Sequence, residues 1–162
     1  MPLTDTKTSG TTAPRSPGPT ASAPRPRARG ELGSEPVERL EAEVIDLSAR
    51  LAAGTYELLV LVGELDHRGS WATWGALSCA AWLADLSEID VATARTQVRV
   101  ARAMRQFPAL DQAMASGDVS YAKARVLAAY LTDANVDDLL AIAATTPAGR
   151  LGAAIAAWSQ RN

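Results

Sequence analysis

Large apolar side chains recur every three or four residues along the segment that follows the first 36 residues. This spacing keeps them on one face of a helix, and the pattern continues for about four heptads. The members of this leucine stripe are Leu40, Val44, Leu47, Leu51, Leu58, Leu61 and Leu65. Gly54 interrupts the stripe, and further apolar residues widen its second half. We therefore expect one long helix that ends near His67 and Gly69, with its second half more deeply buried.

The rest of the sequence also favours helices. Alanine occupies 33 of the 162 positions, whereas aromatic residues make up only 5% of the chain. Alanine is the best helix former, and strands favour β-branched and aromatic residues. After a short turn or helical stub at 70–75, the expected helices span 78–86, 91–106, 109–116, 120–131, 136–144 and 147–159. Their expected N-caps include Ser78, Asp90, Ser120 and Asn135. Because the connections are short, the sequence predicts a compact all-α domain over residues 37–162.

Residues 1–36 differ from this domain in composition. They hold seven of the nine prolines and almost no large apolar side chains, so they cannot bury enough surface to fold, and we expect a disordered tail. Its arginines make it either a solvated leader or an arm that weakly contacts nucleic acid or another acidic partner. The domain itself carries 11 basic and 15 acidic residues. A net charge of −4 does not by itself favour DNA binding.

Several classes of function are excluded by the counts of reactive residues. With one cysteine, Cys79, and one histidine, His67, the chain forms no internal disulfide, no multi-cysteine zinc site and no paired-histidine metal site. Asp66 and His67 are adjacent on a helix and point about 100° apart, so they do not form a general-base pair. No apolar run approaches a membrane span, and the N-terminus has no secretory signal. We expect a cytoplasmic non-enzyme without a cofactor, a small-molecule substrate or a membrane partner.

Four arginines lie at intervals of four, three and three along the helix expected at 91–106. They are Arg95, Arg99, Arg102 and Arg105. They occupy an arc of about 120°, and Val100, Met104 and Phe107 fall on the opposite side. One interpretation is a solvated face paired with acids such as Asp85, Glu88 or Glu64. The other is phosphate contact from the second helix of a helix-turn-helix, although the usual glycine of the turn is absent.

Three tryptophans, Trp71, Trp74 and Trp82, lie between the long helix and this arginine helix. They form either a platform on which bases stack or anchors of the hydrophobic core. A domain so poor in aromatic residues needs its few large side chains to fill space. We therefore expect them in the core.

Several separated motifs carry a resemblance to a known family. They are Trp71-Ala-Thr-Trp-Gly-Ala-Leu-Ser-Cys-Ala-Ala-Trp-Leu-Ala, Ala94-Arg-Thr-Gln-Val-Arg-Val-Ala-Arg-Ala-Met, Phe107-Pro-Ala-Leu and Ala115-Ser-Gly-Asp-Val-Ser-Tyr-Ala-Lys-Ala-Arg. In this order they resemble the domain of unknown function 222, also called the 13E12-repeat family, from about Val37 to the C-terminus. Proteins of this family commonly carry a C-terminal HNH endonuclease domain, which cuts DNA with a metal held by histidine and asparagine. This chain has no histidine after His67, so the resemblance implies the helical domain without the nuclease.

Residues 91–130 are also similar to the DNA-binding core of ParB-type partition proteins, which use a helix-turn-helix there. This similarity rests on the arginine helix, the Phe-Pro pair, Gly117 and the run that begins at Ser120. It implies that Lys123 and Arg125 join the candidate DNA contacts. The full candidate set is Arg95, Arg99, Arg102, Arg105, Lys123 and Arg125.

The sequence leaves three hypotheses for function. The first is a non-catalytic module that assists the association of nuclease-related proteins with duplex DNA. The second is a protein-interaction module, in which the leucine stripe pairs with a second copy or another helix. We expect instead that the stripe packs within its own domain, because the apolar face is wide and Gly54 breaks it. The third is an inert remnant of a shortened nuclease gene.

Overall fold

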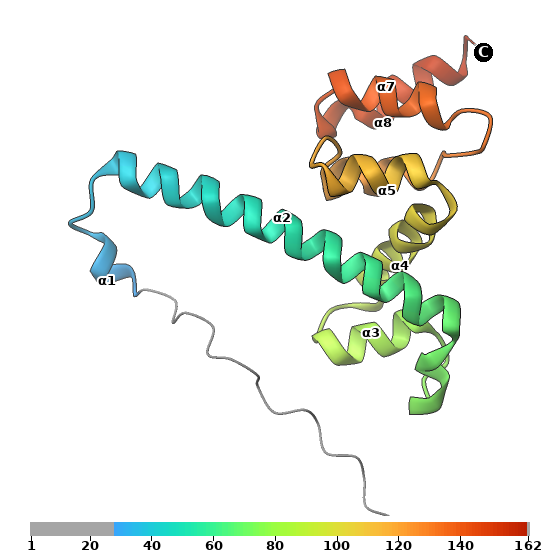
Figure 1. Ribbon diagram of the computed structural model, residues 1–162, viewed down its shortest axis with the longest axis horizontal. Coiled ribbons are helices and arrows are strands. Elements are labelled where there is room, and N and C mark those ends of the chain that lie inside the picture. The colour runs from blue at the N-terminus through green and yellow to red at the C-terminus, as the bar shows by residue number, and fades with distance from the viewer. Residues whose placement is uncertain (1–27, 162) are drawn as a thin grey trace, which may run out of the picture. The chain divides into compact units, whose positions relative to one another are not determined.

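The computed structural model describes residues 28–161, and the disorder expected for residues 1–27 lies outside this range. The described residues fold into helices and connecting turns (Figure 1). In order, the elements are α1 (Arg29–Leu32), α2 (Val37–Arg68), the 3-10 helix η1 (Ser70–Trp74), α3 (Cys79–Ser87), α4 (Val91–Gln106), α5 (Pro108–Ala115), α6 (Tyr121–Leu127), α7 (Val136–Thr145) and α8 (Ala148–Ser159). The predicted all-α class is confirmed. None of the described helices is both long and apolar enough to span a membrane.

The described chain divides into two units, residues 28–40 and residues 41–161. In the described part of the first unit, α1 forms a four-residue helix within the segment that we expected to be disordered. Arg39, in the first turns of α2, lies 3.4 Å from Glu35, the residue before Pro36. Helical structure therefore begins several residues earlier than the predicted boundary at residue 37.

The ends of three helices in the second unit follow from local capping, as predicted. The Asp90 carboxylate accepts a hydrogen bond from the Thr93 N–H at 2.9 Å, and the Ser78 hydroxyl accepts one from the Ala81 N–H at 3.1 Å. The Ser120 hydroxyl accepts a longer one, 3.4 Å, from the Lys123 N–H. Each bond satisfies an N–H group that has no partner within its own helix.

The cap predicted at Asn135 is wrong. Its amide oxygen accepts a hydrogen bond from the Thr132 N–H at 2.7 Å, and its amide nitrogen donates one to the Tyr130 carbonyl at 3.0 Å. The side chain thus fixes the loop before α7 instead of capping that helix. The same loop explains why α6 ends at Leu127, four residues before the predicted end, since the chain is already turning toward Asn135.

The hydrophobic core of the second unit is built from leucine, valine and alanine side chains of every helix from the second half of α2 to α8. Figure 1 shows α5, α7 and α8 stacked at one end of this unit and α3 beside α4 at the other. The second half of α2 joins the core through Leu59 and Val62. Next to them, a Cβ atom on Gly63 would lie 3.2 Å from the Ala101 carbonyl oxygen, so α2 approaches the backbone of α4 closely there.

Most of the leucine stripe does not pack within the domain as we expected. Leu40 and Leu65 are half-buried, but Val44, Leu47, Leu51, Leu58 and Leu61 are all exposed. The buried residues of α2 are Leu59, Val62 and Gly63, which lie on a different face of the helix. The prediction was right that the second half of α2 is more deeply buried and wrong about which face is covered.

Candidate nucleic-acid interface

Two pairs of helices in the region of the arginine helix, α3–α4 and α5–α6, are joined by turns that contain a residue with positive φ or a glycine. Between α3 and α4, Glu88 adopts φ 52°, the left-handed conformation that glycine usually supplies in such a turn. Between α5 and α6, Gly117 adopts φ 84°, and the buried Val119 N–H donates to the Ala113 carbonyl at 2.9 Å. The turn expected between α3 and α4 therefore forms without its glycine, and α5 and α6 make a second helix-turn-helix unit.

Two of the four predicted arginines are bound to acids on α2. The Arg102 guanidinium donates to both Asp66 carboxylate oxygens, from Nε at 2.6 Å and from Nη2 at 2.9 Å. Arg105 donates to Glu64 at 2.5 Å, and Arg68 donates to the other Glu64 oxygen at 2.6 Å. These bonds fasten α4 to the C-terminal end of α2. The arginines that make them already have carboxylate partners.

The protonation equilibria of these acids reflect the same bonds. Hydrogen bonds from Arg102, assisted by its positive charge, hold the pKa of Asp66 below its usual value. Hydrogen bonds from Arg68 and Arg105 similarly lower the pKa of Glu64. The Asp66 side chain is 10% exposed and that of Arg102 is 65% exposed, so the pair lies at the edge of the core. Both acids are therefore ionised partners of arginine at neutral pH.

Lys123 also has a structural partner. Its ammonium group donates to the Ala143 carbonyl at 2.6 Å. In a continuous helix that carbonyl would accept from the N–H four residues later, but position 147 is a proline and has none. Lys123 thus satisfies a carbonyl at the C-terminal end of α7, where a positive charge also suits the helix dipole.

The remaining candidates, Arg95, Arg99 and Arg125, are exposed, and no ion pair to them is found within residues 28–161. We call these three residues the basic cluster. The Arg125 guanidinium carbon lies 5.9 Å from the centre of the Tyr121 ring. Burial raises the pKa of Tyr121, and the positive charges of Arg125 and Arg99 oppose that shift. Guanidinium groups from α4 and α6 therefore lie around one half-buried tyrosine.

Of the acids that we expected to pair with the four arginines of α4, only Glu64 does so. Asp85 and Glu88 form no ion pair within the described part of the chain. Asp66, which we did not predict as a partner, makes the two-bond contact. A signal for it was present in the sequence: Asp66 follows Leu59, Val62 and Gly63 at helical spacing, and an acid on a buried face needs a cation.

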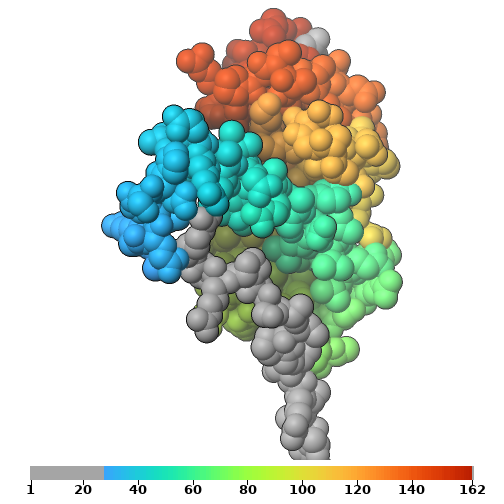
Figure 2. All heavy atoms as spheres, turned by 60° about the vertical axis from the view of Figure 1, so that its left-hand side comes forward, coloured from blue at the N-terminus to red at the C-terminus, as the bar shows by residue number. Residues whose placement is uncertain are grey.

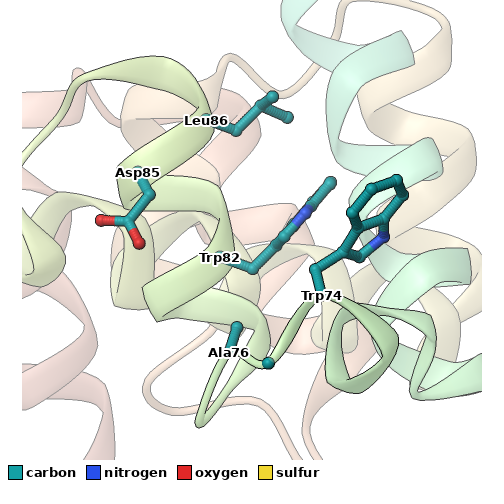
Figure 3. A pocket seen from close by; sticks show the side chains of 6 residues that line it. Trp74, Ala76, Trp82, Asp85 and Leu86 are labelled. Carbon is teal, nitrogen blue, oxygen red and sulfur yellow. The ribbon is translucent and has the colours of Figure 1, made fainter. Parts of the chain in front are cut away.

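The tryptophans divide between core and surface. Trp71 and Trp82 are partly buried against the core, as expected, whereas Trp74 is 65% exposed. Trp74 and Trp82 line an open pocket together with Ala76, Asp85 and Leu86 (Figure 3). A carboxylate at the rim of this pocket is unfavourable for a nucleic-acid backbone. We therefore place no DNA contact there.

Cys79 is buried, as expected, with 1% of its surface exposed. Burial, together with the negative charge of Asp66, raises the pKa of its thiol to about 11. The thiol is therefore protonated at neutral pH and is a poor nucleophile. Asp66 directs its carboxylate to Arg102, and within residues 28–161 no three His, Cys, Asp or Glu side chains are placed to hold a metal ion together.

Comparison with known proteins returns one family. Searches among curated proteins and among solved structures give no match. A family model, described as a domain of unknown function (DUF222), matches residues 38–159, which include α3 to α8 and nearly all of α2. The match covers most of the chain, and the protein therefore belongs to the DUF222 family.

Proposed function

We propose that this protein is a non-catalytic helical module that binds the phosphate backbone of duplex DNA through the basic cluster. The observation that carries the proposal is that Arg95, Arg99 and Arg125 are exposed and have no acidic partners in the described chain, whereas the other candidate cations are engaged. The charges of Arg99 and Arg125 both act on Tyr121, and Arg95 lies one helical turn from Arg99. A cluster without internal partners binds an anion without first breaking an ion pair.

The geometry of the cluster suits phosphate contacts. Arg95 and Arg99 are one helical turn apart on α4, about 6 Å along its axis. Arg125 adds a cation from α6, the second helix of the α5–α6 unit. The planar guanidinium group donates two parallel hydrogen bonds to a phosphate, which makes arginine the preferred residue for such contacts. Contacts of this kind position a protein on DNA without reading its sequence.

In this proposal the protein acts in the cytoplasm and uses no cofactor. It also explains how a domain with a net charge of −4 binds DNA: the favourable field is local to one surface and is not a property of the whole domain. Attraction of this kind acts at short range in physiological salt, since the Debye length is about 8 Å.

The salt dependence of DNA binding tests this proposal. Each phosphate contact contributes about −0.9 to the slope of log affinity against log salt, so three contacts give about −2.7. If all four arginines of α4 contacted phosphates, the slope would be about −3.6. Fluorescence anisotropy of a labelled duplex with the full chain, from about 50 to 200 mM salt, measures the slope. We expect a slope of −2.7, or steeper if the basic N-terminal residues add contacts; absent binding, or binding independent of salt, would contradict the proposal.

A further inference from the structure

One apolar face of α2 is left uncovered by the described residues of the second unit. The seam, as we name it, consists of Val44, Leu47, Leu51, Leu58 and Leu61, which are 63%, 50%, 64%, 40% and 62% exposed. These positions alternate in steps of three and four, as the a and d positions of a coiled coil do, and Gly54 takes the d position between Leu51 and Leu58. In Figure 2 the cyan and teal spheres of α2 lie at the surface.

The seam and the face that packs against the domain are distinct. At 100° per residue, Leu59, Val62 and Asp66 centre about 80° around the helix from the centre of the seam, and Val62 lies at the boundary between the two faces. Leu59 and Val62 are buried and Asp66 is bonded to Arg102, so the domain covers that side. The seam is therefore surplus to the fold of the domain.

The first half of α2 gives a second reason to expect a partner. Every residue from Val44 to Gly54 is exposed, so no side chain in these three turns of helix is buried against the described part of the domain. An isolated helix of that length is marginal in water. Exposed helices that stand alone are polar on all sides, yet this one presents valine and leucine along one line.

We propose that the seam pairs with the seam of a second copy of this chain. Residues 1–27 of the chain are a poor cover for it, because their only large apolar side chains are Met1 and Leu3. A second copy supplies an apolar stripe of the same length and period, and about a two-fold axis each stripe buries the apolar side chains of the other. The seam runs for about two and a half heptads, or about 26 Å, which gives the two helices an extended line of contact.

Side-chain size and charge favour an antiparallel pair. Two parallel copies in register would set Gly54 opposite Gly54 and leave a gap, whereas antiparallel copies set each Gly54 opposite a valine or leucine. Along the flank of the seam, Arg50 has Glu43 seven residues before it and Glu57 seven residues after it. In an antiparallel pair this flank of one helix faces the same flank of the other helix. Arg50 of one copy therefore lies beside a glutamate of the other.

The mass of the full chain in solution tests the pairing. In sedimentation velocity and light scattering we expect dimers at tens of micromolar protein. Leu47→Glu places a charge in the seam and should weaken dimerisation by about 100-fold or more. Ile45→Glu is the matched control, because Ile45 is 71% exposed on the same helix but lies outside the seam; this variant should remain dimeric.

Three results would overturn the proposal: a monomeric wild-type chain at about 200 µM, a Leu47→Glu variant that remains dimeric, or equal weakening by the two variants. Circular dichroism shows whether both variants keep the wild-type helix content, as expected for exposed positions.

A Val44→Cys variant tests the relative direction of the two helices in the pair. Its copies cross-link on oxidation if the helices are parallel and in register, which would contradict the antiparallel arrangement. The pairing does not depend on the DNA proposal, since the seam and the basic cluster share no residue.

Discussion

Replacing Arg95, Arg99 and Arg125 together with glutamine should lower the affinity for duplex DNA about 500-fold in 0.1 M salt. The magnitude follows from counterion release, since each phosphate contact contributes about a factor of eight between 0.1 M and 1 M salt. The three side chains are exposed and have no ion-pair partner in the described chain, so the substitution should leave the fold intact. Anisotropy titrations of one labelled duplex with both proteins measure the ratio.

The matched control removes the same charge from elsewhere on the domain. Arg68, Arg150 and Arg161 are exposed, and none lies on α4 or α6. Their replacement with glutamine should change the affinity only slightly, through the net charge. Equal losses from the two triple variants would show that DNA senses the total charge and not the basic cluster.

Asp66→Asn should destabilise the protein by about 1–2 kcal/mol at pH 7. The change removes a carboxylate that is 10% exposed and leaves the Arg102 guanidinium without its charged partner at the edge of the core. The cost falls short of that of a fully buried pair because the Arg102 side chain is 65% exposed and remains solvated. Urea unfolding followed by circular dichroism measures the difference in the free energy of unfolding.

The same loss should depend on pH in a defined direction. Folding lowers the pKa of Asp66, so the folded state binds this proton more weakly than the unfolded state. The stabilisation is therefore complete above the unfolded value of about 4 and disappears as the pH falls through the lower folded pKa. The difference in the free energy of unfolding between wild type and Asp66→Asn should be constant near neutrality and should become smaller below about pH 4.

Asp46→Asn provides the control for this prediction. Asp46 lies on the same helix and pairs with Arg50 at 2.7 Å, but both side chains are more than 60% exposed. Exposed pairs contribute little, so we expect a change below about 0.5 kcal/mol. A comparable loss from both substitutions would mean that the Arg102–Asp66 contact has no special role in joining α4 to α2.

The parts of the fold that sequence reasoning predicted are those fixed by local chemistry. α4 begins after Asp90, which caps it, and ends before Pro108, which disfavours helix at Phe107; both signals lie within a few residues of the helix end. The end of α6 was missed because Asn135, eight positions beyond Leu127, holds the loop. The leucine stripe was identified correctly as an apolar face, but periodicity alone does not say whether the domain or a partner covers it.

The candidate site was predicted in part for the same reason. The spacing of the arginines placed them on one face of α4, and this is a property of the helix alone. Which of them stay available depends on α2: Asp66 lies 36 positions before Arg102, and Glu64 lies 41 positions before Arg105. Likewise, the bond from Lys123 to Ala143 exists because of a proline four residues beyond that carbonyl. Contacts at such separations require the tertiary structure.

The most direct test of the central claim compares the salt slopes of two single variants with that of the wild-type chain. Arg99→Gln removes a member of the basic cluster and should make the slope for duplex DNA shallower by about 0.9. Arg102→Gln removes an arginine that is bonded to Asp66 and should leave the slope unchanged. The proposed function rests on the distinction between arginines that are free to bind phosphate and arginines that are bonded to acids of α2. Equal changes in the two slopes, or a change only for Arg102→Gln, would contradict that distinction.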